Sequence, residues 1–170
     1  MASPPVQWLQ RTAWYARPPR GPAVPLRRHE VRGIAFHWPG VPRPIRPDRV
    51  AAAILGWQGH HVDDRGWNDI AYSHLVDQTG RVWCGRGVRV RSAANGATAA
   101  NASHLAVCLI VAEDELVSPE LVEATRRLVT YIRSEWPTAM QLVGHGDIRP
   151  TPTECPGPAI RSALRAGRLG

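Results

Sequence analysis

Three residues from two distant parts of the chain have side chains that commonly bind metal ions: His37, His145 and Cys155. Each histidine ends a short apolar run, GIAFH or QLVGH, and a loop containing glycine or proline follows at once. Cys155 lies on the loop after the second histidine, in TPTECPGP. If both runs are strands that end at one edge of a sheet, the three side chains can form a tetrahedral zinc site with one position open for water, which is typical of catalytic zinc.

A simpler interpretation exists for such residues. A single histidine at the end of a strand is more often a hydrogen-bonded surface or core residue than a ligand. We expect this of the histidines without an assigned role, which are His29, His60, His61, His74 and His104. Cys84 and Cys108 lie in apolar runs and suit burial as small hydrophobic residues. Cys155 lies among proline, threonine and glycine, where reactivity or metal binding explains a thiol better than packing does.

The elements that must position these residues alternate between strands and helices. GIAFH (33–37) and MQLVGH (140–145) predict two strands, and the apolar run at 104–112 predicts a central strand covered on both faces. Two apolar segments around DQTG predict a β-hairpin. We therefore expect an α/β fold in which helices flank one central mixed β-sheet in a single domain.

Three helices are predicted around these strands. The first begins at Asp48, whose side chain we expect to cap it. The clearest helix begins at Ser118 and Pro119 and stops at Pro137. The last is a short helix in PGPAIRSALRAGRLG, near the C-terminus.

The positive charge of the chain is concentrated near its N-terminus. All 21 basic residues are arginines, and nine of them fall in the first fifty residues against two acids, Glu30 and Asp48. The remainder balances at twelve of each sign, so the excess of +7 is N-terminal. Such a region attracts polyanions, either nucleic acid or anionic cell-wall polymers, and a solvated surface explains the charge equally well. We expect no nucleic-acid partner, because the sequence contains no recognition-helix, zinc-finger or RNA-binding signature.

Three blocks of the sequence resemble a known family. GIAFHWPG, GWNDIAYSHLVDQTGRVWCGRG and LVGHGDIRPTPTECPGPAI are similar to the signature blocks of the zinc-dependent N-acetylmuramoyl-L-alanine amidases. Phage lysozyme-type endolysins and peptidoglycan recognition proteins share these blocks. RTAWYARPPR also resembles the N-terminal segment of the family, so the resemblance spans roughly residues 8–160. It implies a central mixed sheet flanked by helices, with one Zn²⁺ at the floor of an open groove.

The resemblance assigns roles to five residues. His37, His145 and Cys155 match the three zinc ligands of the family. Tyr72, in DIAYSHLVD, matches a tyrosine that lies beside the metal-bound water, although a core aromatic is the alternative from the residue type alone. Thr153 occupies the position where relatives carry Lys or Thr to support the oxyanion.

Substrate contacts follow the family pattern less closely. Many relatives have Tyr-His-Phe where this chain has Tyr72, Ser73 and His74, and Ser92 and Ala93 stand where relatives have His-Ala. The substrate-binding residues that we predict along the groove are Trp38, Trp67 and Asn101. Core packing is an equally good interpretation of both tryptophans.

The resemblance also implies an organisation of the chain. We divide it into an Arg- and Pro-rich segment, expected to be irregular and packed on the domain (1–32), a zinc amidase catalytic domain (33–164) and a tail or start of a linker (165–170). With 44% apolar and 21% charged residues, no apolar stretch as long as a membrane span and no secretory signal, the chain is expected to be soluble and made in the cytoplasm. We also expect a monomer.

The function implied by the resemblance is hydrolysis of the amide bond between N-acetylmuramic acid and L-alanine in bacterial peptidoglycan. We expect a phage endolysin that stays in the host cytoplasm until the membrane is permeabilised, with anionic wall polymers as further partners of the arginine-rich N-terminus. A non-catalytic peptidoglycan-binding module and a cytoplasmic muropeptide-recycling amidase are the alternatives. Since non-hydrolytic recognition proteins have lost the cysteine ligand, Cys155 favours the enzyme.

Overall fold

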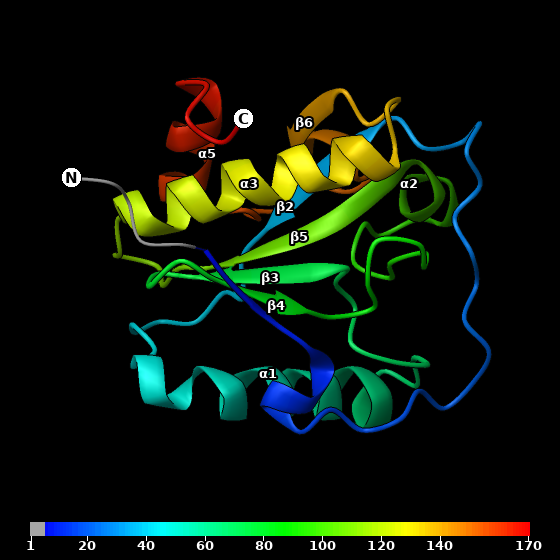
Figure 1. Cartoon of the computed structure of the whole chain (residues 1–170), viewed down its shortest axis with the longest axis horizontal. Helices are drawn as coiled ribbons and strands as arrows, with labels where there is room; N and C mark the ends of the chain where they lie inside the picture. The colour runs from blue at the N-terminus through cyan, green and yellow to red at the C-terminus, as the bar shows by residue number, and fades with distance from the viewer. Residues whose placement is uncertain (1–5) are drawn as a thin grey trace.

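A computed structural model describes residues 6–170 of the protein. Six strands form one sheet in the order β1-β4-β3-β5-β2-β6 (Figure 1). Their bounds are Gln7–Leu9 (β1), Gly33–His37 (β2), His74–Asp77 (β3), Arg81–Cys84 (β4), His104–Ile110 (β5) and Gln141–Gly144 (β6). Strands β3 and β4 pair antiparallel, whereas the other neighbours pair parallel. The predicted mixed sheet is therefore confirmed.

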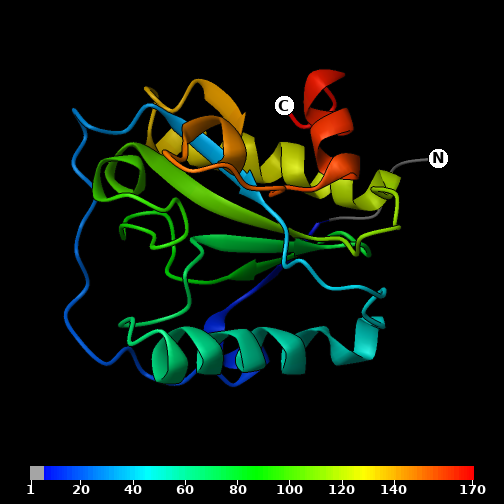
Figure 2. The same ribbon diagram turned by 180° about the vertical axis from the view of Figure 1, so that it is seen from behind.

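Helices cover both faces of this sheet. Helix α1 (Val50–Gly59) lies on one face, and α3 (Pro119–Glu135) and α5 (Pro158–Arg165) lie on the other, as Figures 1 and 2 show from opposite sides. The shorter helical elements are η1 (Arg11–Trp14), η2 (Pro47–Arg49), the π-helical turn η3 (His60–Asp64), α2 (Thr98–Ser103) and α4 (His145–Ile148). No helix within residues 6–170 has the combined length and apolar character that crossing a membrane requires.

After His104, strand β5 is apolar because it faces a core on each side. Leu105, Val107 and Leu109 belong to the core beneath α3 and α5. Cys108 and Ile110 belong to the core beneath α1. Since successive side chains of a strand point to opposite faces, this alternation explains the continuous apolar run.

Helix α3 forms as its sequence predicts. The Ser118 hydroxyl accepts a hydrogen bond from the backbone N–H of Leu121 (3.0 Å), and Pro119 occupies the first turn, where its missing N–H is not needed. Leu121, Leu128 and Ile132 are buried against the sheet. The N-cap and the buried stripe together fix the position of this helix.

Two local predictions are wrong. Part of the segment expected to be irregular forms β1 and η1, which place Trp14 in the core with its Nε1 donating to the Cys84 carbonyl (2.9 Å). Asp48 does not cap α1, because Pro47 begins the separate turn η2 and α1 follows only after Arg49. The Asp48 carboxylate instead accepts from the Arg46 guanidinium (3.1 Å).

Candidate metal centre and groove

The ends of two neighbouring strands bring the predicted ligands together. Strands β2 and β6 pair parallel with Phe36 opposite Gly144, so the residues that follow, His37 and His145, lie side by side. Their ring centroids are 4.5 Å apart. The loop after α4 returns Cys155 to the same edge, with its Sγ 3.7 Å from His37 Nδ1. One potential ligand atom from each of the three residues lies within 4.8 Å of the others.

The backbone of the loop that carries Cys155 is held by several hydrogen bonds. Arg161 donates to the carbonyl oxygens of Thr153 (3.1 Å) and Cys155 (2.8 Å). Gly146 N–H donates to the Cys155 carbonyl (3.1 Å), and the Thr153 hydroxyl oxygen accepts from the Cys155 N–H (3.2 Å). The thiol is therefore held by a defined turn rather than by a free loop.

Burial sets the protonation of the three side chains. It lowers the pKa of His37 to about 3, with a further contribution from His145, and it lowers the pKa of His145 to about 4. Both imidazoles are thus neutral at pH 7, the form in which histidine binds a metal. Burial also raises the pKa of the Cys155 thiol to about 11, so the thiol keeps its proton until a nearby cation draws it off.

The chemistry of this site fits a zinc ion. Two imidazole nitrogens and one sulfur are a donor set that zinc binds, with a fourth position left for water or substrate. His145 Nε2 is buried and has no hydrogen-bond partner among residues 6–170. An unsatisfied buried polar atom costs about 1–3 kcal/mol of stability. A bound metal ion would give His145 Nε2 the partner that it lacks.

Tyr72 lies against the same cluster. Its ring centroid is 5.6 Å from that of His37. Burial raises the pKa of Tyr72 well above its ordinary value, and the Cys108 and Cys155 thiols add to the shift. The phenol is therefore protonated at neutral pH and can donate a hydrogen bond.

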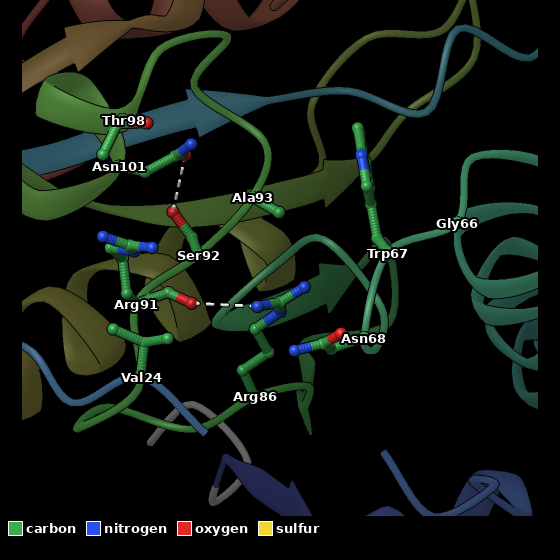
Figure 3. Close-up of a pocket in the computed structure, with 10 residues that line it drawn as sticks. All are labelled: Val24, Gly66, Trp67, Asn68, Arg86, Arg91, Ser92, Ala93, Thr98 and Asn101. Carbon is green, nitrogen blue, oxygen red and sulfur yellow. Dashed lines mark hydrogen bonds between the residues drawn. The ribbon is translucent and has the colours of Figure 1, made fainter. Parts of the chain in front are cut away.

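Two adjoining pockets form a groove beside His145. The larger, of about 460 Å³, is lined by Arg65 and Arg149, and the smaller, of about 260 Å³, by Arg86 and Arg91 (Figure 3). The two pockets share Trp67, Ala93, Thr98 and Asn101. No aspartate or glutamate from the described part of the chain lines either pocket, so the groove is positively charged.

The predicted groove residues differ in their positions. Trp67 stands across the smaller pocket from Asn101, and both residues line the two pockets. Trp38 lines neither; its ring packs on Gly157, where an added Cβ would come within 2.5 Å of the indole. The structure therefore brings Trp67 and Asn101 into the groove and leaves Trp38 beneath the Cys155 loop.

Two residues that the sequence did not single out also belong to the site. His61, on η3, stacks on Trp67 (5.2 Å between ring centroids) and lies 5.7 Å from Tyr72. Burial lowers its pKa to about 4. The side-chain oxygen of Asn95 lies 2.8 Å from His37 Nε2. The alanine-rich loop around Asn95 has no pattern that identifies this contact, whereas the paired histidines at 60 and 61 are visible but uninformative.

This arrangement defines a class of protein. The chain has the fold of the peptidoglycan recognition proteins: the solved structure of wild-type Drosophila peptidoglycan recognition protein LB superposes with a TM-score of 0.78. The superposition covers 94% of this chain and 93% of that chain at 26% sequence identity. A family profile described as N-acetylmuramoyl-L-alanine amidase matches residues 27–158, and the chain belongs to this family.

Curated relatives agree with this assignment. Peptidoglycan-recognition protein LB of Drosophila melanogaster is 28% identical over 162 residues, which cover 88% of this chain and 63% of that protein. The N-acetylmuramoyl-L-alanine amidase of Homo sapiens is 38% identical over 79 residues, which cover 45% of this chain and 14% of that protein. The chain thus spans less than two thirds of the length of either relative.

Proposed function

We propose that this protein is a zinc-dependent amidase that hydrolyses the bond between N-acetylmuramic acid and L-alanine in bacterial peptidoglycan. The observation that carries the proposal is the convergence of His37, His145 and Cys155, with ligand atoms within 4.8 Å of one another, at a groove lined by arginines. The family match over residues 27–158 supports the same chemistry.

The three converging residues would hold the ion. A zinc ion held there would supply water activation at neutral pH and polarisation of the substrate carbonyl. His37 and His145 are already neutral, so neither must lose a proton to become a ligand. Cys155 must lose its proton, and its negative charge then offsets part of the charge of the cation.

Tyr72 and Thr153 are the proposed catalytic residues. The half-buried phenol of Tyr72 stays protonated, so it is suited to orient the attacking water through a hydrogen bond rather than to act as a base. The Thr153 oxygen already accepts from the Cys155 N–H, which leaves its own hydroxyl hydrogen free to donate. We assign that hydrogen to the substrate oxygen on which negative charge develops; loss of one such donor costs about 2.7–4 kcal/mol.

The groove is proposed to bind the stem peptide. Arg65, Arg86, Arg91 and Arg149 line it, and no aspartate or glutamate of residues 6–170 lines it with them, which suits a peptide that carries free carboxylates. Trp67 and Asn101 would contact the substrate from opposite sides. Trp38 would act on substrate only through the Cys155 loop on which it packs.

The arginine-rich N-terminus supports a second proposal, that anionic wall polymers bind there. Five of its nine arginines pair with aspartates: Arg11, Arg17, Arg20, Arg46 and Arg49. Arg27, Arg28 and Arg43 are exposed and have no acidic partner within residues 6–170. An endolysin role, location in the host cytoplasm before lysis, a monomeric state and the division at residues 32 and 164 all stay predictions.

Digestion of purified peptidoglycan tests the enzymatic proposal. We expect new L-alanine N-termini, detected by mass spectrometry, that disappear with a chelator and return with added zinc. Cys155→Ser should lose at least a hundredfold in rate, whereas Cys84→Ser, which alters a half-buried cysteine outside the cluster, should keep the wild-type rate. Release of reducing sugars, chelator-resistant cleavage or full activity of Cys155→Ser would reject the mechanism. Binding of peptidoglycan without cleavage would identify a recognition module instead.

A further inference from the structure

We propose that Asn95 is a positioning residue that selects the metal-binding nitrogen of His37. Its side-chain oxygen accepts a hydrogen bond from the Nε2–H of His37, which leaves Nδ1 of the same ring as the nitrogen that can bind a metal. The inference rests on the proposed function in that it assumes a metal at the His37, His145 and Cys155 cluster.

The orientation of the Asn95 side chain is decided by its other contacts. Asn95 is fully buried on the loop between β4 and α2. Its Nδ2 lies 2.8 Å from the carbonyl oxygen of His104 and 3.1 Å from that of Ala100. Two carbonyl acceptors on one side require the NH₂ group there, so the side-chain oxygen must face His37.

This oxygen in turn decides the tautomer of His37. A neutral imidazole carries one N–H, and a carboxamide oxygen can only accept. At 2.8 Å from Oδ1, Nε2 must therefore carry the hydrogen. Nδ1 then has the free lone pair, and it is Nδ1 that lies 3.7 Å from the Cys155 sulfur. The tautomer that Asn95 selects is the one that presents a lone pair to the cluster.

Among residues 6–170, Asn95 supplies the hydrogen-bond partner of His37 Nε2. His37 is 2% exposed and Asn95 is 0% exposed, so bulk water has no access to the bond between them. His145, by contrast, has no side-chain hydrogen-bond partner within residues 6–170. Of the two histidines, His37 alone has its tautomer fixed by another side chain of the described residues, and partners of this kind typically contribute 10–100-fold to metal affinity.

Asn95 is itself attached to the groove. Its backbone N–H donates to the Asn101 side-chain oxygen (2.9 Å), and the Ser92 hydroxyl contacts the same oxygen (3.3 Å, Figure 3). Asn101 lines both pockets. The residue that borders the groove thus holds the loop from which Asn95 reaches the metal ligand.

Two variants separate this role from a structural one. Asn95→Leu has nearly the same shape but no acceptor. Asn95→Asp, as the neutral acid, keeps a carbonyl oxygen toward His37, while its hydroxyl donates to the His104 carbonyl in place of the NH₂ group. We expect zinc affinity, measured by competition with a chromophoric chelator, to fall 10–100-fold in Asn95→Leu and to stay within about threefold of wild type in Asn95→Asp. Zinc binding by Asn95→Leu within twofold of wild type would overturn the proposal.

A measurement on the unaltered protein keeps the proposal testable if Asn95→Leu does not fold. The ¹⁵N resonances of His37 in the zinc-free protein should show a protonated Nε2 and an unprotonated Nδ1 at pH 7. A protonated Nδ1 would overturn the proposal. Neither readout uses substrate, so a failure of the amidase proposal is distinct from a failure of this one. Wild-type protein that binds no zinc would reject the proposed function, while the tautomer would still report on the contact with Asn95.

Discussion

At the level of single residues, His74 illustrates the cost of burying an imidazole away from the candidate metal centre. It is 5% exposed on β3, and its Nδ1 has no hydrogen-bond partner within residues 6–170. It lines a largely apolar pocket of about 430 Å³ together with Trp8 and Tyr131. Burial lowers its pKa to about 4 from an ordinary value of 6.5. The folded state therefore holds His74 neutral where the unfolded chain would protonate it.

This difference predicts a loss of stability in mild acid. As the pH falls below 6.5 the unfolded state gains a proton first, so stability decreases until the folded His74 also titrates near pH 4, and levels off below. Between pH 7 and pH 5, His74 lowers the unfolding free energy by roughly 2 kcal/mol. Urea unfolding of the zinc-free protein measures the unfolding free energy at pH 7 and at pH 5. The decrease between the two should be smaller in His74→Leu than in wild type by about this amount.

A surface histidine provides the matched control. His29 is exposed, so His29→Leu should keep the wild-type difference between pH 7 and pH 5. If His74→Leu and His29→Leu lose equal stability on acidification, burial does not keep His74 neutral in the folded state. The buried His37 and His145 shift stability in the same direction, which is why the comparison is made between variants rather than from wild type alone.

At the level of secondary structure elements, one carboxylate organises the β3–β4 hairpin. Asp77 Oδ1 accepts from the Thr79 N–H (2.9 Å) and hydroxyl (2.6 Å). Asp77 Oδ2 accepts from Arg81 Nε (2.6 Å) and Trp83 Nε1 (2.8 Å). Asp77 is 2% exposed, so these bonds form with little competition from water.

Removal of this carboxylate should destabilise the whole domain. Asp77→Ala leaves the Arg81 charge and the Trp83 N–H without a partner inside the hairpin, and we expect a loss of about 3–5 kcal/mol in unfolding free energy. Asp63→Ala removes exposed pairs with Arg17 and Arg20 and should cost less than about 1 kcal/mol. Urea titrations of both variants make the comparison; equal losses would show that the hairpin does not depend on Asp77.

The same elements show which features a sequence can predict. The DQTG hairpin, β5 and α3 have local patterns: a turn signal, an alternation over two faces, and a capped apolar stripe. The meeting of the β2 and β6 ends could be predicted from the sequence because both apolar runs finish in histidine. Strand β1 could not be predicted, because three residues are too few to show a periodic pattern and the partner strand β4 lies more than seventy residues further on.

Asn95 could not be predicted for a similar reason. Its role exists only through contact with His37, which is 58 positions away in the sequence. Nothing in its neighbouring residues distinguishes it from Asn68 or Asn101. A residue that binds a metal can be recognised by its type, as histidine and cysteine are here. A residue that positions a metal-binding side chain can be recognised only by where it lies in the folded structure.

At the level of the whole molecule, the proposed ion would join segments that are distant in the chain. His37 and Cys155 are 118 positions apart, and they come from the end of β2 and from the loop that precedes α5. Unfolding separates these ligands, so an ion that binds only the folded state must stabilise it by mass action. At a free zinc concentration of about one hundred times the dissociation constant, the gain is about 2.7 kcal/mol.

We therefore expect zinc to raise the melting temperature of the zinc-free protein by roughly 5–11 °C under these conditions, since about 1 kcal/mol shifts the Tm of a chain of this size by roughly 2–4 °C. Magnesium at the same concentration should have no comparable effect, because it prefers oxygen ligands to imidazole and thiolate. Cys155→Ser should reduce the shift by removing the sulfur ligand, whereas Cys84→Ser should retain it. Circular dichroism melts of the three proteins, each in chelator and in zinc, make the measurement. Identical melts of the wild-type protein in chelator and in zinc would mean that the three side chains converge without joining these segments through an ion.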